Sequence, residues 1–161
     1  MSTSDCQKHL SGALGRIPSG LFVVTARRGE AETGMLASWV QQCAFEPPSL
    51  SMAVQRGRDI AAWLTDGSWF TLNILDDTQT DMIVHFGRGF APDEPAFAGL
   101  EIERPESGGP VLQEALAYLE CRVVGRHETG DHDLFIGQCI RGRLLSEGHP
   151  MIHVRKSGFH Y

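Results

Sequence analysis

The sequence lacks three features that would each assign it to a broad class of protein. No segment approaches the run of about 20 apolar residues that spans a bilayer, so we expect no membrane association. Acidic residues outnumber basic ones, 20 to 14, and the resulting net charge of -6 argues against a nucleic-acid partner. The first residues show no basic segment followed by an apolar stretch, which predicts a cytoplasmic protein without a secretory signal.

Several motifs of catalytic and metal-binding proteins are also missing. The four cysteines form no CxxC pair, so we expect most of them to be buried thiols rather than parts of a disulfide framework or a zinc ribbon. There is no P-loop, no HExxH and no GxSxG. Residues 87–92 begin like a dinucleotide fingerprint, but Pro92 stands where the third Gly or Ala belongs and the segment follows a predicted helix. We therefore expect no Rossmann turn.

What the sequence does contain is a strong β pattern within one domain. At 161 residues and 17.7 kDa the chain suits a single domain, residues 1–161. Short, β-branched or alternating runs predict strands near 21–26, 33–40, 50–54, 69–75, 119–123 and 134–144. Strands outnumber helices and do not alternate with them regularly, which predicts a mainly β, β-rich α+β fold.

Helical spacing is confined to three places. Leu10 and Leu14 belong to an amphipathic N-terminal helix, Ile60 and Leu64 to a helix after the strand 50–54, and Met82 to a helix that Asp76 or Asp77 would cap. Residues 87–109 have little periodicity and read as a long excursion with a brief strand near 100–103.

Residues 34–39, Gly-Met-Leu-Ala-Ser-Trp, place small side chains in a predicted strand. Gly34, Ala37 and Ser38 would let a flat ring system approach the main chain, whose amides can bond its polar edge. A bulge or a tight barrel corner explains the same residues without a ligand.

Two further segments carry polar groups that suit a phosphorylated ligand. Gln55, Arg56 and Arg58 lead into a predicted helix start, where an anion would be attracted, although a solvated loop capped by Asp59 is the alternative. Asn73, the only asparagine, interrupts an apolar strand, and its amide must bond either the backbone or a ligand such as a ribityl chain.

His132 lies in a turn between the two longest predicted strands, flanked by Asp131 and Asp133. The two carboxylates would position the imidazole and favour its protonated form. The other histidines form no recognised ligand spacing, so we expect no metal site.

Taken in order, several segments resemble the flavin reductase-like family, the FMN-binding split barrels. The similarity extends from about Leu14 to the C-terminus and rests on residues 16–25, 34–39, 45–48, 70–75, 85–86, 115–121, 130–132 and 153–156. The resemblance implies a Greek-key split β-barrel with flanking helices, which forms a homodimer with the flavin near the subunit interface.

The resemblance also implies roles for individual residues. His132 would be the catalytic residue, near the flavin or the nicotinamide. The implied cofactor-binding residues are Gly34, Met35, Leu36, Ala37, Ser38, Trp39, Gln55, Arg56, Arg58, Asn73, Leu75, His85 and Arg155.

The strand 34–39 departs from the pattern common in this family. Many members have Thr and Ser where this chain has Leu36 and Trp39, which removes two hydroxyl groups, and Trp39 would crowd or stack on the ring. In this motif the chain is closer to the flavin reductase-like domains of flavodiiron proteins.

The leading hypothesis is therefore an NAD(P)H:flavin oxidoreductase. It would take hydride from NADH or NADPH onto FMN, or onto FAD, and deliver reduced flavin or electrons to a monooxygenase or another acceptor protein. One alternative is an FMN-binding electron-transfer protein without its own NAD(P)H activity. A second is a cofactor-free split barrel that acts as an interaction module.

Overall fold

A computed structural model describes residues 3–160, so the first two residues and the last residue of the predicted 1–161 domain lie outside the described residues. Strands dominate, which confirms the mainly β class. They are β1 (Ser19–Gly20), β2 (Phe22–Arg28), β3 (Ala31–Ala37), β4 (Val40–Phe45), β5 (Pro48–Gln55), β6 (Trp69–Ile74), β7 (Ile102–Glu103), β8 (Val111–Leu112), β9 (Ala117–Glu128), β10 (His132–Leu144) and β11 (Ile152–His153). The helices are α1 (Thr3–Gly15), the 3₁₀ turn η1 (Asp59–Ala62) and α2 (Thr80–Gly87).

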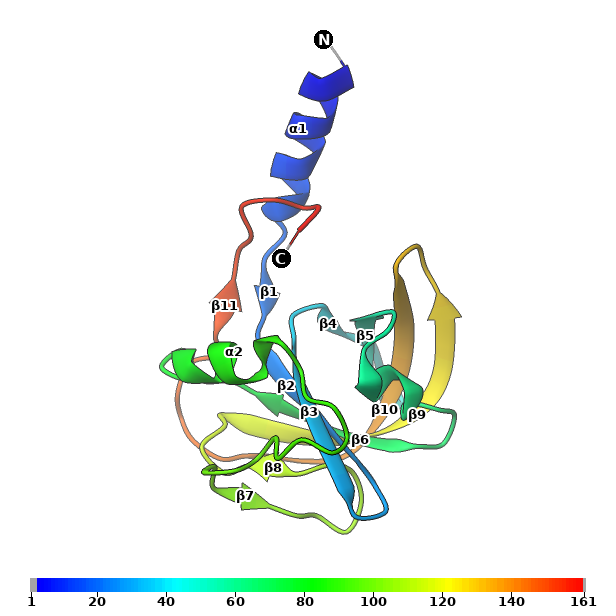
Figure 1. Cartoon of the computed structure of the whole chain (residues 1–161), viewed down its shortest axis with the longest axis vertical. Coiled ribbons are helices and arrows are strands. Elements are labelled where there is room, and N and C mark those ends of the chain that lie inside the picture. The colour runs from blue at the N-terminus through cyan, green and yellow to red at the C-terminus, as the bar shows by residue number, and fades with distance from the viewer. Residues whose placement is uncertain (1–2, 161) are drawn as a thin grey trace.

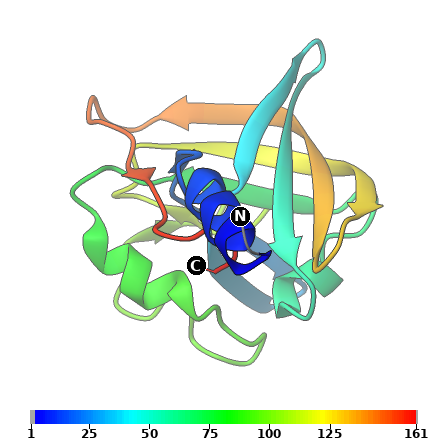
Figure 2. The same cartoon turned by 90° about the horizontal axis from the view of Figure 1, so that it is seen from above.

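Seven strands form one antiparallel sheet in the order β3-β2-β6-β9-β10-β5-β4. The two edge strands, β3 and β4, are consecutive in the chain, and Ser38 and Trp39 alone separate them. The sheet must therefore curl until its edges meet at this corner, where the Ala53 N–H donates to the Trp39 carbonyl over 3.0 Å. In Figure 2 the strands curve round a shared interior, and the β4–β5 hairpin projects from the rim. No ladder joins β3 to β4 within residues 3–160, so the barrel is split along that side.

The interior of the barrel is apolar. Val24, Met52, Val54, Phe70 and Phe135 are fully or almost fully buried in one cluster. Because side chains alternate along a strand, the residues next to these five point to the other face of the sheet. Burial of one such side chain contributes about 1.5–3 kcal/mol, so this cluster fixes the strand register.

Helix α2 packs on the outside of β3 through a close contact with a glycine. A Cβ atom on Gly34 would lie 3.0 Å from the ring of Phe86, which is itself fully buried. The missing side chain at Gly34 therefore lets α2 approach β3, and the helix brings its other residues to the open side of the barrel.

A polar layer covers the outside of β2 and β6. The Thr25 hydroxyl donates to the Pro110 carbonyl over 2.7 Å, and the Thr71 hydroxyl donates to the Gly109 carbonyl over 2.8 Å. A Cβ atom on Gly109 would lie 2.3 Å from the backbone of Thr25, so only glycine allows the chain this close. The excursion that follows α2 thus folds back and closes this face.

The two ends of the chain lie together. Strand β1 pairs with β11, and the Gly158 N–H donates to the Ser11 carbonyl of α1 over 2.8 Å. Helix α1 stands away from the barrel in Figure 1, and Gly15 is its one buried residue. None of the helices in the described part of the chain is long and apolar enough to cross a bilayer.

Several predicted elements differ from the structure. The predicted strand 33–40 is two strands, because the chain leaves β3 at Ser38 and crosses to β4. The predicted helix after Arg58 is only the four-residue η1. Helix α2 begins after Gln79 with no side-chain cap, because the Asp76 carboxylate instead accepts hydrogen bonds from Thr78.

Candidate functional site

A cavity of about 310 Å³ lies at the open side of the barrel, and we call it the slit cavity. One wall is β3, the opposite wall is β5, and α2 and β11 contribute residues at its sides. Its lining residues are Leu21, Met35, Leu36, Ala37, Ser38, Ala53, Gln55, Arg58, Ile83, Gly87 and His153. Most of these side chains are apolar or small, which suits a flat, largely apolar ligand group.

The wall formed by β3 also offers main-chain hydrogen-bonding groups. Because β3 is an edge strand, alternate N–H and C=O groups of its backbone point away from β2. Met35, Leu36 and Ala37 bring this edge to the slit cavity. A planar ligand with polar atoms along its rim can therefore bond the backbone while its faces contact side chains.

A second cavity of about 320 Å³ shares Met35 and Arg58 with the first, and we call it the arginine cavity. Its lining includes Arg88, two glycines with positive φ at Gly57 and Gly89, and the Glu94 carboxylate. Arg58 donates to the Arg88 carbonyl over 2.6 Å, and Arg88 is paired with Glu94 at 3.0 Å. Arg58 thus stands where an apolar cavity meets a charged one.

The pKa of the Glu94 carboxyl is lowered, first by the hydrogen bond from the Ala91 backbone N–H and then by Arg88. The carboxylate therefore stays charged near neutral pH and holds the Arg88 guanidinium over the arginine cavity. The Arg88 guanidinium also lies 4.5 Å from the centre of the Phe90 ring.

The structure brings most of the predicted β3 and β5 residues together. Met35, Leu36, Ala37, Ser38, Gln55 and Arg58 all line the slit cavity, and Gly34 lines the arginine cavity. The helix start expected to attract an anion is a 3₁₀ turn of four residues, which is too short for a strong helix dipole. The positive charge at this position comes from Arg58 itself.

Trp39, His132 and Arg155 form a cluster beside the slit cavity. The ring centres of Trp39 and His132 are 4.8 Å apart, and the Arg155 guanidinium lies 4.8 Å from the Trp39 ring. His132 pairs in register with Gln55, which lines the cavity. Trp39 therefore packs against these two side chains and leaves the space beside Ala37 and Ser38 open.

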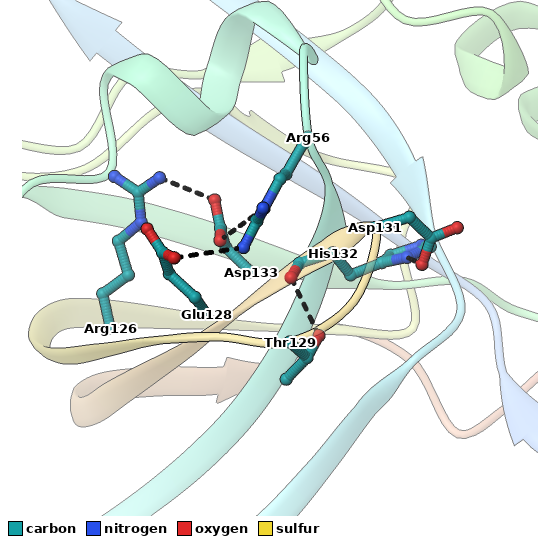
Figure 3. Close-up of polar contacts among 7 residues, drawn as sticks. All are labelled: Arg56, Arg126, Glu128, Thr129, Asp131, His132 and Asp133. Carbon is teal, nitrogen blue, oxygen red and sulfur yellow. Dashed lines mark hydrogen bonds and ion pairs between the residues drawn. The ribbon is translucent and has the colours of Figure 1, made fainter.

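The His132 ring is held by its neighbour in sequence. Its Nδ1 atom lies 2.7 Å from the Asp131 carboxylate, and the side chain of His132 is 7% exposed. The hydrogen bond with His132 is the main reason that the pKa of Asp131 is lowered. Figure 3 shows the pair at the tip of the β9–β10 hairpin.

Arg56, predicted to bind a phosphate, is turned away from both cavities. It bonds the Asp133 carboxylate at 3.2 Å and lies 3.4 Å from Glu128, while Arg126 bonds the other oxygen of Asp133 at 2.6 Å (Figure 3). The Asp133 side chain is only 3% exposed, so its charge requires these partners. Arg56 belongs to this ion-pair cluster because β5 and β10 are neighbours in the sheet.

Asn73 and Leu75, predicted for the ribityl region, are not brought to the cavities. The Asn73 amide nitrogen donates to the carbonyls of Val23 and Pro110, and its oxygen accepts from the Leu112 N–H over 2.8 Å. Both Asn73 and Leu75 are fully buried. The backbone, rather than a ligand, provides the partners of this amide.

His85 is also directed elsewhere. Its Nε2 atom lies 2.8 Å from the Ala96 carbonyl, and its ring contacts those of Phe86 and Phe90. The residues of α2 that reach the slit cavity are instead Ile83 and Gly87.

Sequence reasoning missed the contribution of the segment that follows α2. Arg88 and Gly89 line the arginine cavity, and they belong to the glycine-containing run 87–92 that failed the Rossmann pattern. The glycines of this run indicated a tight backbone turn, but not which cavity the turn would line. Leu21 and His153 were not predicted as site residues, although both lie in segments that carry the family resemblance. The pairing of β1 with β11 that brings these segments together joins residues far apart in the chain. No group of three or more His, Cys, Asp or Glu residues in the described range is arranged to hold a metal ion.

Relatives in sequence and structure agree on the family. A putative diflavin flavoprotein A 3 from Synechocystis is 47% identical over 150 residues, which cover 92% of this chain and 25% of that protein. The chain thus spans about a quarter of the length of the curated relatives that it matches.

Solved structures of flavin reductases have the same fold. The NADH:FAD oxidoreductase SgcE6 from Streptomyces globisporus matches with a TM-score of 0.84 at 25% identity, over 97% of this chain and 92% of that chain. Its complex with NAD and FAD fragments matches with a TM-score of 0.81. The styrene monooxygenase flavin reductase from Pseudomonas putida matches with a TM-score of 0.75 at 26% identity, over 89% of this chain and 90% of that chain.

The family model for the flavin reductase like domain matches residues 14–160, which is nearly the whole chain. The split barrel, the slit cavity and these relatives together identify the family. The chain belongs to the flavin reductase-like domain family.

Proposed function

We propose that the chain is an NAD(P)H:flavin oxidoreductase that binds FMN, or the FMN half of FAD. The observation that carries the proposal is the position of Arg58, which joins the apolar slit cavity to the charged arginine cavity. A flavin nucleotide has the same two parts, a flat ring system and a phosphate. Bound flavin would supply the redox chemistry, since it accepts a hydride.

The residues present fit such a group. The slit cavity offers the edge of β3 for the polar rim of a ring, and small side chains at Ala37 and Ser38 beside it. The arginine cavity offers the guanidinium of Arg58 and the backbone at Gly57 and Gly89 for a phosphate. Each cavity has a volume at the lower end of the 300–1,000 Å³ typical of ligand sites, and together they suit a mononucleotide.

For the nicotinamide nucleotide we propose the side of the slit cavity where Trp39, His132 and Arg155 meet. Arg155 supplies positive charge, and the His132 ring is oriented by Asp131. Holding two reactants in the right orientation can lower the activation barrier by about 7–11 kcal/mol, so hydride transfer here requires no acid–base pair. The complex of SgcE6 with NAD and FAD fragments supports a nicotinamide site in a protein of this fold.

The decisive experiment is steady-state oxidation of NADH and of NADPH by the purified chain with added FMN or FAD. We expect turnover with at least one nucleotide and one flavin, and a flavin absorbance spectrum that is lost on reduction. Flavin binding without turnover by either nucleotide would contradict the reductase proposal. Failure to bind any flavin would also exclude the electron-transfer alternative.

The alternative function, an electron-transfer protein that holds FMN, has one specific observation in its favour. The relatives named diflavin flavoproteins are about four times as long as this chain, so in them the domain works beside others. For either function we propose a protein acceptor such as a monooxygenase, which the name of the Pseudomonas putida structure supports.

His132 can be tested separately. We propose that it contacts the nicotinamide or the flavin, so His132→Ala should lower turnover more than flavin affinity. The matched control is His127→Ala, an exposed histidine on the same hairpin. Equal turnover in both variants would leave His132 with a structural role.

We further propose that the chain forms a homodimer. Helix α1 has 13 residues and little contact with the barrel, and an isolated helix of that length is marginal in water. Apolar surface is also exposed around the paired chain ends, at Leu10, Ile17, Ile152 and Val154.

Sedimentation tests this proposal. It should give the mass of a dimer, and Leu10→Ser with Ile152→Ser should shift the mass toward that of a monomer. Val84→Ser, on the exposed side of α2, is the control.

A further inference from the structure

Two cysteines face each other across the longest hairpin. Cys121 of β9 and Cys139 of β10 are paired in register, and their Sγ atoms are 3.8 Å apart. Both are free thiols. Neither lines the slit cavity or the arginine cavity, so the pair is separate from the proposed flavin site.

The pairing already provides the geometry that a disulfide needs. Residues directly opposite in an antiparallel ladder have Cα atoms about 4.5–5.5 Å apart, within the 4.4–6.8 Å found across disulfides. The ladder is irregular directly after Cys139, where its register shifts before Arg141. Because the two Cα atoms are already opposite each other, rotation of the side chains can shorten the 3.8 Å Sγ–Sγ distance while the strands stay in register.

The two thiols differ in access and in acidity. Cys121 is fully buried in the core cluster, whereas Cys139 is half-buried at its border. The Cys121 S–H donates to the Cys139 sulfur. This hydrogen bond lowers the pKa of Cys139 and raises the pKa of Cys121, and burial raises the pKa of Cys121 further. Cys139 is thus the nucleophile, since the thiolate is the reactive form, and Cys121 is positioned to react second.

We propose that Cys121 and Cys139 form a two-thiol oxidation site that hydrogen peroxide converts to a disulfide. The Cys139 thiolate attacks one peroxide oxygen, the O–O bond breaks, and the products are a sulfenic acid at Cys139 and, after proton uptake, water. The Cys121 sulfur then attacks the Cys139 sulfur and the S–O bond breaks. The departing hydroxide takes the Cys121 thiol proton and leaves as a second water as the S–S bond forms. Two thiols and one peroxide give one disulfide and two waters.

The test uses a chain in which Cys6→Ser and Cys43→Ser remove the two exposed thiols. This chain is treated with hydrogen peroxide, unfolded, alkylated and mapped by mass spectrometry. We expect the Cys121 and Cys139 thiols to disappear together as one linked peptide pair, and dithiothreitol to restore both. Retention of both thiols after an exposure that fully oxidises a free model thiol would overturn the proposal.

The order of the two steps has its own test. In the same background, Cys121→Ser should trap the sulfenic acid at Cys139, which dimedone labels, whereas Cys139→Ser should leave Cys121 unlabelled. Labelling of Cys121 instead, or irreversible oxidation of Cys139 while Cys121 stays a thiol in the parent chain, would contradict the assignment. Because the parent test needs no change in the core, it holds even where a core variant fails to fold.

Discussion

Two places in this barrel carry polar or small residues within apolar strands. One borders an open cavity, and the other is covered by another segment of the chain. Beside β3, the small residues Ala37 and Ser38 border an open cavity. On the outside of β2 and β6, Thr25, Thr71 and Asn73 are covered by the chain's own segment at Gly109 and Pro110. The difference is set by a segment distant in the sequence, which satisfies one set of groups and leaves the other accessible to a ligand.

The largest effect should come from breaking the closed region. Asn73→Ala removes a buried amide and leaves its three backbone partners without a hydrogen bond to it. We expect the free energy of unfolding to fall by about 2–4 kcal/mol. Denaturant unfolding measures this loss. The flavin dissociation constant of the folded variant should stay unchanged, and a weakened constant with normal stability would instead make Asn73 a ligand residue.

A smaller effect is expected at the open region. Arg58→Ala should weaken FMN binding by about 10- to 100-fold, because a charge-assisted hydrogen bond contributes about 1.5–3 kcal/mol to the binding free energy. Riboflavin, which has no phosphate, should lose much less affinity, as titration of each flavin would show. The control is Arg56→Ala, since Arg56 is paired with Asp133 and Glu128. Equal loss for FMN and riboflavin would remove the phosphate role of Arg58.

The slit cavity can also be filled from its helical side. Ile83→Trp should place an indole in the cavity and weaken both FMN and riboflavin by about tenfold, or 1.4 kcal/mol. Val84→Trp is the matched control, because Val84 is the next residue of α2 and is 84% exposed. Flavin titration that finds the same affinity in both variants would place the ring elsewhere.

The smallest predicted effect concerns the acid stability of the ion-pair cluster of Asp133, Arg56 and Arg126, which lies away from both cavities. Arg126 and Arg56 lower the pKa of the Asp133 carboxyl in the folded chain. The stabilisation is therefore present above the ordinary Asp pKa of about 3.9 and is lost as the pH falls below it toward the folded value. Unfolding followed from pH 6 downward should show a smaller acid dependence in Asp133→Asn than in the exposed control Asp66→Asn.

The sequence predicted the parts of this structure that depend on local pattern. Alternation and β-branching predicted strands near 21–26, 69–75 and 134–144, and these are present as β2, β6 and β10 with ends that differ by one or two residues. The residues of β3 and β5 at the slit cavity followed from small side chains and a charged strand end. The family resemblance, which rests on the order of several segments, is confirmed by relatives in sequence and structure.

The sequence alone did not indicate which partner each polar side chain would have. Arg56 and Arg58 are two residues apart and look equivalent, but the pairing of β5 with β10 brings Asp133 to the first and not to the second. The sequence left the Asn73 amide to bond either the backbone or a ligand, and the return of the chain at Pro110 provides the backbone partner. Such choices depend on contacts between residues far apart in the chain, which local periodicity does not report.

The outer edge of β3 has one more consequence. Exposed strand edges are templates on which other chains can add a strand, and proteins usually protect them. Here the edge along residues 35–38 lies against the slit cavity rather than against another strand. A molecule that fills this cavity would therefore also cover the backbone groups of β3 that no neighbouring strand pairs.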